Sequence, residues 1–301
     1  MEATELYRCP ACHAVLTANT AGGMACRRCR LAFPAVAAAI PDLTYPPALP
    51  LEVAATRRYF EALAPSYDRR LTQLLKTNEA TFRRRLAERL ELVGEHLILE
   101  TGVGTGGNVP YLLEQHPRNR FVGLDLSPAM LLHGAARFAH YRDRVTLCVA
   151  NAEYLPFAGG TFDRVLHFGF ISDFQDRRRG LQEMIRVLKE GGVAVVSDDS
   201  IHPEIRQASW AQELMQNNPS FAAMPPVDEL PSDVGSYDLA WFSGVFYILV
   251  LRKAGYKTQG GVDAGCTRWT TERDGRDPVI GARERFAEIP ALLSIAENRR
   301  S

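Results

Sequence analysis

The sequence predicts an α/β protein: an open, mostly parallel β-sheet with helices on both faces, preceded by a small cysteine-rich module. Three observations support this. Short apolar runs alternate with stretches of helical periodicity between residues 96 and 197. The first run ends in a glycine-rich segment, 102–107, that opens a helix; this is how a nucleotide-binding turn is built in such a sheet. Two closely spaced pairs of cysteines lie near the N-terminus.

Composition excludes several classes of protein. The 301 residues are 46% hydrophobic and 23% charged with a net charge of +0, so no global field favours nucleic acid or a membrane surface. No apolar run approaches the ~18 residues of a membrane span. The segment MEATELYRCP lacks the basic and apolar regions of a signal peptide. We therefore expect a cytoplasmic protein without a membrane span.

The first module carries the strongest metal-binding pattern. Cys9 and Cys12 are separated by thirteen residues from Cys26 and Cys29, and two C-x-x-C pairs at this spacing predict a closed, structural zinc site rather than a redox centre. Residues 1–47 resemble the Trm112-like zinc ribbon, which occurs alone or fused ahead of methyltransferases. The isolated cysteines, Cys148 and Cys266, are predicted to be core residues.

The glycine-rich turn fits two ligands. Gly102, Gly104 and Gly107 match the dinucleotide pattern G-x-G-x-x-G. Together with Glu100, the set Gly102, Gly104 and Gly106 resembles motif I of class I S-adenosylmethionine (SAM) dependent methyltransferases. A carboxylate at the strand tip repels a pyrophosphate but suits the ammonium and sulfonium of SAM, by on the order of a few kcal/mol. The charge thus favours SAM over NAD; a turn that binds nothing is the third reading.

The second and third strands add two polar residues. Residues 120–125 read as a strand with Asp125 at its tip, where an acid accepts hydrogen bonds from ribose hydroxyls or caps the following helix. Residues 145–150 form the next strand and lead into NAEYLPF, which resembles the methyltransferase motif D-A-E-x-L-P-F. Asn151 stands where the family has an aspartate, and its oxygen can still accept a bond from the adenine amino group. This string favours SAM further.

The lead-in segment resembles that of ubiquinone/menaquinone-type methyltransferases. The residues YFEALAPSYD, 59–68, carry the likeness, which implies that Tyr67 contacts SAM; an aromatic buried between helices is equally compatible. Apolar residues between 71 and 93 recur at helical spacing and predict an amphipathic helix. The run 83–85, three arginines, is expected to be its solvated face.

The resemblance covers roughly residues 57–285, including VLKEGG and DPVIGARE. It implies a Rossmann-like, seven-stranded class I methyltransferase domain over 48–301, with a helical insertion over 200–247 that caps the pocket or forms a plain helical layer. It also places three more residues at the cofactor, namely Asn108, Leu126 and Ala152.

Patterns in the second half predict the remaining elements. Strands are expected at 162–168 and 193–197, with a helix at 177–188 between them. A helix is expected over 249–255, followed by a last hairpin of 256–262 with 279–282. The segment 287–301 is read as a short helix and a frayed tail.

Catalytic candidates lie at strand tips. His167 lies at the tip of the fourth strand and is a candidate general base, since an imidazole titrates near neutrality; a core histidine is the competing reading. Other candidates are Asp173, Asp198, Asp199 and His202. The acidic pair could bind Mg²⁺ as in catechol-type sites, although a loop acid beside a helix cap is the commoner arrangement.

Three functions fit these residues. A small-molecule methyltransferase is favoured, because the aromatic residues of 200–247 can form a pocket. An RNA methyltransferase that uses the ribbon is the alternative, and Arg27, Arg28 and Arg30 support it locally. Yet residues 1–47 hold four basic and three acidic residues, a net of +1, where RNA usually requires a broad basic surface. A non-catalytic SAM-binding scaffold is the third possibility.

Overall fold

The computed structural model describes residues 3–19, 23–37, 40–75, 79–255 and 269–271. Cys266, the DPVIGARE motif, both strands of the hairpin expected at 256–262 and 279–282, and the tail 287–301 lie outside the described residues. Within the described part, no helix is both long and apolar enough to cross a membrane.

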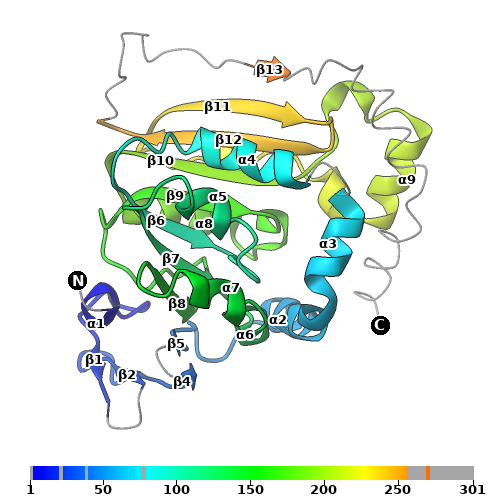
Figure 1. The fold of residues 1–301 in the computed structure, drawn as a ribbon. Helices are drawn as coiled ribbons and strands as arrows, with labels where there is room; N and C mark the ends of the chain where they lie inside the picture. The colour runs from blue at the N-terminus through cyan, green and yellow to red at the C-terminus, as the bar shows by residue number, and fades with distance from the viewer. Residues whose placement is uncertain (1–2, 20–22, 38–39, 76–78, 256–268, 272–301) are drawn as a thin grey trace.

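One large sheet organises the chain, with the order β13-β11-β12-β10-β9-β6-β7-β8 (Figure 1). Its strands are β6 (Leu97–Thr101), β7 (Arg120–Asp125), β8 (Val145–Val149), β9 (Phe162–Phe168), β10 (Leu188–Asp199), β11 (Val234–Phe242), β12 (Phe246–Lys253) and β13 (Trp269–Thr271). The five strands from β8 to β10 are parallel, and β12 runs antiparallel between β10 and β11. The predicted α/β class is confirmed: seven strands form the expected sheet, and the short β13 pairs with β11.

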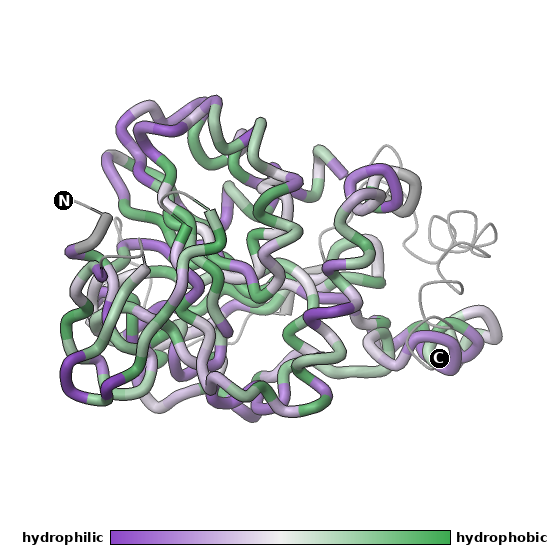
Figure 2. Tube along the Cα trace, turned by 90° about the horizontal axis from the view of Figure 1, so that it is seen from below, coloured by the Kyte–Doolittle hydropathy of each residue, from purple (hydrophilic) through white to green (hydrophobic). Residues whose placement is uncertain are grey.

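Helices cover both faces because alternate strand residues are apolar on both sides. Ile98 packs with α4 (Glu79–Arg89) and α5 (Val109–Leu113), whereas Leu99 packs with α8 (Arg177–Val187) on the opposite face, as period-two side-chain alternation requires. In Figure 2 hydrophobic stretches run through the middle of the molecule. The helices are α1 (Ala3–Leu6), α2 (Leu51–Leu63), α3 (Tyr67–Leu75), α4 (Glu79–Arg89), α5 (Val109–Leu113), α6 (Pro128–His133), α7 (Ala135–His140), α8 (Arg177–Val187) and α9 (Ser209–Asn217).

Two helix predictions need correction. The single helix expected between 71 and 93 is divided into α3 and α4. The helical insertion expected over 200–247 is helical only in its first part, in α9 and the short turns η4 (Pro203–Ile205), η5 (Pro219–Ala222) and η6 (Val227–Glu229). Residues 234–253 form the β11–β12 hairpin instead, and β12 takes up residues 249–253 of the helix predicted over 249–255. A continuous apolar run cannot be assigned to strand or helix by periodicity, and pairing with β10 decides it here.

The N-terminal module packs against the β8 edge of the sheet (Figure 1). It contains β1 (Thr17–Ala18), β2 (Met24–Ala25), β3 (Ala32–Phe33), β4 (Ala35–Ala37) and β5 (Ile40–Pro41). The hydroxyl of Tyr7 donates to the Leu147 carbonyl at 3.0 Å, and the main-chain N–H of Leu43 donates to the Val149 carbonyl at 2.7 Å. Its apolar residues join the core cluster on the α8 face. The module therefore covers a sheet edge that would otherwise expose unpaired backbone groups.

Candidate cofactor pocket and four-cysteine cluster

A pocket lies at the carboxyl ends of β6, β7, β8 and β9, where ligands bind in open α/β sheets. One end is lined by the glycine turn and by the residues after β7 and β8. The other end is lined by the residues after β9. The wall is completed by Tyr67 and by four residues of helix α2, namely Val53, Thr56, Arg57 and Phe60. The predicted site residues that line the pocket are Tyr67, Gly102, Gly104, Asp125, Leu126, Asn151, Ala152, His167 and Asp173.

Three predicted residues do not line the pocket, because they lie behind the glycine turn: Glu100, Gly106 and Asn108. The backbone of Gly106 has φ +82°, and a Cβ there would sit 2.4 Å from the Phe138 ring. Glu100 is 1% exposed, and its Oε1 accepts a hydrogen bond from Nδ2 of Asn108 at 2.6 Å. Burial raises the pKa of Glu100 to about 8, while the Asn108 bond and the charge of Arg83 oppose that shift. Its Oε2 makes no hydrogen bond within the described residues.

Asp125 links two parts of the pocket wall. Its Oδ2 accepts a bond from the Gly104 N–H at 2.8 Å, and its Oδ1 accepts one from the Ser127 N–H at 2.8 Å. Burial raises the pKa of Asp125 to about 6, and these backbone bonds favour the charged form. Ser127 itself caps α6 by accepting from the Met130 N–H. The helix-cap reading of Asp125 is therefore wrong for that residue, which lines the pocket.

Asn151 is 6% exposed and belongs to a tight local turn. Its Oδ1 accepts from the Glu153 N–H at 3.0 Å, and its Nδ2 donates to the Tyr45 carbonyl at 3.4 Å. The Tyr45 ring packs edge-on against Tyr154, with centroids 5.1 Å apart. The joint after the cysteine module thus contacts the pocket wall. No sequence pattern predicted this contact, since it joins residues more than 100 positions apart.

His167 is 2% exposed, at the end of β9. Its Nδ1 lies 3.0 Å from the Thr101 carbonyl oxygen and 2.8 Å from the Thr101 hydroxyl. Burial lowers the pKa of His167 to about 4, so the ring is neutral near pH 7. In the tautomer whose Nδ1–H donates to this carbonyl, the lone pair is on Nε2, which makes no hydrogen bond within the described residues.

Aromatic rings surround His167 on the pocket wall. Phe174 packs edge-on against the imidazole with centroids 5.1 Å apart, and Phe170 packs on Phe60 at 4.7 Å. With Phe168 these rings make this end of the pocket apolar. The sequence placed the aromatic pocket in 200–247; the structure supplies it instead from α2 and from residues 168–174, which begin at the last residue of β9.

Three other catalytic candidates lie away from the pocket lining. Both carboxylate oxygens of Asp198 accept main-chain bonds, from Phe170 at 2.8 Å and Ser172 at 2.9 Å, so this acid holds the loop after β9 in place. His202 caps η4, and its ring packs against Trp241. Asp199 follows Asp198 on β10 and pairs with Phe246 across the sheet.

The lead-in is tied to the glycine turn by Asp68. Its Oδ1 accepts from the Thr105 hydroxyl at 2.5 Å, and its Oδ2 pairs with Arg137 at 3.0 Å. Arg137 also donates to the Thr105 carbonyl. These bonds hold Tyr67 over Gly104, where a Cβ would lie 3.9 Å from the tyrosine ring. The sequence indicated Tyr67 but not this connection.

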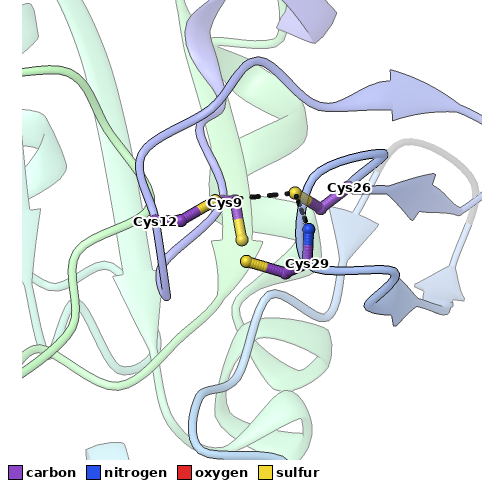
Figure 3. A group of neighbouring side chains, drawn as sticks. All are labelled: Cys9, Cys12, Cys26 and Cys29. Carbon is purple, nitrogen blue, oxygen red and sulfur yellow. Dashed lines mark hydrogen bonds between the residues drawn. The ribbon is translucent and has the colours of Figure 1, made fainter.

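The four cysteine sulfurs converge from two knuckles (Figure 3). All four lie within 4.8 Å of one another, and Sγ of Cys12 is 3.7 Å from Sγ of Cys26. A tetrahedral ion with ~2.3 Å metal–sulfur bonds would separate its sulfurs by about 3.8 Å. The Cys29 N–H donates to the Cys26 sulfur at 3.3 Å. The four thiolates therefore fit a single closed metal site.

Comparisons with known proteins agree with this architecture. Residues 98–192 match the model of the methyltransferase domain family. The chain is 36% identical over 149 residues to the ubiquinone/menaquinone biosynthesis C-methyltransferase of Geobacter sp. (strain M21), a match that covers 48% of this chain and 63% of that protein. The match thus spans less than two thirds of that relative.

Two solved structures share the fold. Geranyl diphosphate C-methyltransferase from Streptomyces coelicolor A3(2) superposes with a TM-score of 0.51 at 16% identity, covering 69% of this chain and 99% of that one. A SAM-dependent methyltransferase from Thermotoga maritima, described as a possible histamine N-methyltransferase, has a TM-score of 0.50 at 20% identity and covers 65% and 99%.

Proposed function

We propose that this chain, whose residues 98–192 match the methyltransferase domain family, is a class I SAM-dependent methyltransferase that transfers the methyl group of SAM to a small organic acceptor. The observation that carries the proposal is one continuous pocket that joins the glycine turn to the apolar wall after β9. The relative from Geobacter is named as an enzyme of quinone biosynthesis, which supports a small organic acceptor for this chain.

The residues at the glycine end fit SAM. Gly102 and Gly104 line the pocket without side chains, at φ +70° and +56°. Asp125 is placed for the ribose hydroxyls, and Asn151 retains acceptor capacity for the adenine amino group. Glu100 lies just behind the turn and, in its ionised form, supplies negative charge toward the ammonium. When bound, SAM supplies an already activated methyl group, so the protein contributes chiefly positioning.

The residues after β9 would orient the acceptor. The neutral imidazole of His167 can accept a hydrogen bond at Nε2 from an acceptor hydroxyl or amine. Phe168, Phe170 and Phe174 exclude water around it. A pKa of about 4 makes His167 a weaker base than a histidine whose pKa is near 7. Its main role is therefore to orient the acceptor, and accepting a proton is secondary.

We further propose that the four-cysteine cluster holds zinc in a structural role. Four thiolates leave no open position for chemistry. The module packs on β8 through Tyr7 and Leu43, so the ion would stabilise the wall that carries Asn151.

The direct test is the destination of a labelled methyl group. The protein would be incubated with methyl-labelled SAM and bacterial extract, and solvent-extractable small molecules separated from RNA and protein. Label in the small-molecule pool is the expected result. Label only in RNA would instead support an RNA methyltransferase, with the exposed Arg27, Arg28 and Arg30 as candidate RNA contacts. SAM binding without transfer into any pool would favour the scaffold alternative.

A further inference from the structure

Arg83 is a buried cation that has no role in the methyl transfer proposed above. It lies on α4 and is 6% exposed, although its neighbours Arg84 and Arg85 are exposed. The expectation that all three form a solvated face is therefore wrong for Arg83. Burying a guanidinium is costly unless its charge and donors are satisfied, so its contacts indicate what it does.

These contacts fix the guanidinium behind the glycine turn. Its Nε donates to Oε1 of Glu79 at 3.0 Å, and its carbon lies 5.6 Å from the ring centroid of Phe168. A Cβ on Gly107 would sit 2.6 Å from Nη2, so only glycine leaves room for the guanidinium there. Arg83 is thus held between the turn and the wall that carries Phe168.

Arg83 also dictates the orientation of Asn108. Its Nη1 donates to Oδ1 of Asn108 at 2.6 Å. Because a guanidinium has donors only, the amide oxygen must face it, and the amide nitrogen must face Glu100, to whose Oε1 it donates at 2.6 Å. This leaves Oε2 of Glu100 as a buried oxygen without a hydrogen bond in the described part of the chain.

The charge on Glu100 depends on the groups around it. Arg83 on α4 favours the carboxylate and Asp125 on β7 opposes it, while Asn108 stabilises the carboxylate by its hydrogen bond. Tyr67 on α3 also faces this carboxyl, and burial keeps the tyrosine neutral by raising its pKa. Glu79 partly balances the charge of Arg83. Arg83 is the one cation among these groups.

We propose that Arg83 is a positioning residue of the SAM site, which orients Asn108 and favours the ionised form of Glu100, whose free oxygen then attracts the cofactor's ammonium. This inference rests on the proposed function. Since burial raises the pKa of Glu100 to about 8, SAM affinity should increase as the pH rises through that value. Without Arg83, the increase should occur at higher pH.

The test measures SAM dissociation constants by calorimetry from pH 6.5 to 9.5. Arg83→Met removes the charge, Arg83→Gln removes the charge but can still bond Asn108, and Arg83→Lys restores the charge. Arg84→Met, one position away on the exposed side of α4, is the matched control. Thermal unfolding of every variant separates loss of fold from loss of affinity.

We expect the midpoint of the pH dependence to move up by about one unit in Arg83→Met and Arg83→Gln, which corresponds to roughly fivefold weaker binding at pH 8 and roughly tenfold weaker binding well below it. Arg83→Lys and Arg84→Met should keep the wild-type midpoint. If Arg83→Met does not fold, Arg83→Gln decides. A folded, uncharged variant with the wild-type midpoint overturns the inference. A wild-type protein that binds no SAM at any pH would instead remove the proposed function, and this inference with it.

Discussion

The main-chain N–H of Gly104 donates a hydrogen bond to Oδ2 of Asp125 at 2.8 Å, so the tip of β7 holds the glycine turn after β6. The same carboxylate accepts from the Ser127 N–H through its other oxygen. One side chain therefore fixes both walls of the cofactor end of the pocket.

Replacing that carboxylate should separate the two walls. We predict that Asp125→Ala weakens SAM binding at least tenfold, because the ribose acceptor and the anchor of Gly104 are lost together. Asp125→Asn keeps one acceptor oxygen and should lose less affinity. Calorimetry measures both, and an unchanged dissociation constant in Asp125→Ala would remove this residue from the site.

Glu100 should destabilise the ligand-free protein at alkaline pH. Its pKa is raised to about 8 in the fold, above the ~4.3 of an unfolded chain. Between these values the unfolded chain binds fewer protons, so the free energy of unfolding falls as the pH rises from about 4.3 to about 8.

The isosteric variant Glu100→Gln tests this. It keeps an acceptor for Asn108 and should raise the free energy of unfolding at pH 9 by on the order of 1 kcal/mol or more, while weakening SAM binding. Urea unfolding at pH 5.5 and pH 9 gives the comparison. A variant with the same pH dependence as the wild type would show that Glu100 is not the titrating group.

Packing behind the turn predicts a steric effect at Gly106. In Gly106→Ala the new methyl would lie 2.4 Å from the Phe138 ring, at a backbone φ of +82°. Gly160→Ala is the matched control, since its φ is +66° but no atom lies within 4 Å of the added Cβ. The control should cost roughly 1–2 kcal/mol of stability, and Gly106→Ala about 1–3 kcal/mol more. Equal losses in chemical denaturation would contradict the clash.

The cysteine cluster predicts a stoichiometric metal. Wild-type protein should contain one zinc per chain by elemental analysis, and Cys26→Ser should lose it and melt at a lower temperature. Cys148→Ala removes a buried cysteine outside the cluster, so it should keep a full equivalent. Full zinc content in Cys26→Ser would refute a four-thiolate site.

His167 should affect turnover rather than cofactor affinity. We predict that His167→Ala lowers kcat at least tenfold and leaves the SAM dissociation constant within about twofold, because Nε2 would contact the acceptor. With a pKa of about 4, His167 should produce no inflection in kcat between pH 5.5 and 8. Equal rates in the variant would leave His167 as a structural residue.

Local sequence patterns were sufficient to predict the strands in the first half of the sheet. The strands predicted at 120–125 and 162–168 have those bounds, because each is a short apolar run closed by polar or glycine residues. The β11–β12 hairpin was missed because Phe246–Leu251 is apolar without alternation. Only pairing with β10 identifies it as a strand.

Parts of the site depended on contacts that no local pattern contains. Arg83 looked like part of an exposed basic run, yet Glu79 four residues earlier and Leu86 three residues later place it on the buried side of α4. That spacing could have indicated it. The contacts of Tyr45 with Asn151 and of Asp68 with Thr105 join distant segments, so they follow only from the fold.

The central claim is that the pocket between Gly102 and His167 binds SAM. It is tested most directly by titrating the wild-type protein with SAM and, separately, with NAD by calorimetry at pH 8.5, where Glu100 is ionised. We expect one SAM per chain and no measurable NAD binding, because the carboxylate behind the turn repels a pyrophosphate. Binding of NAD with SAM excluded would contradict it.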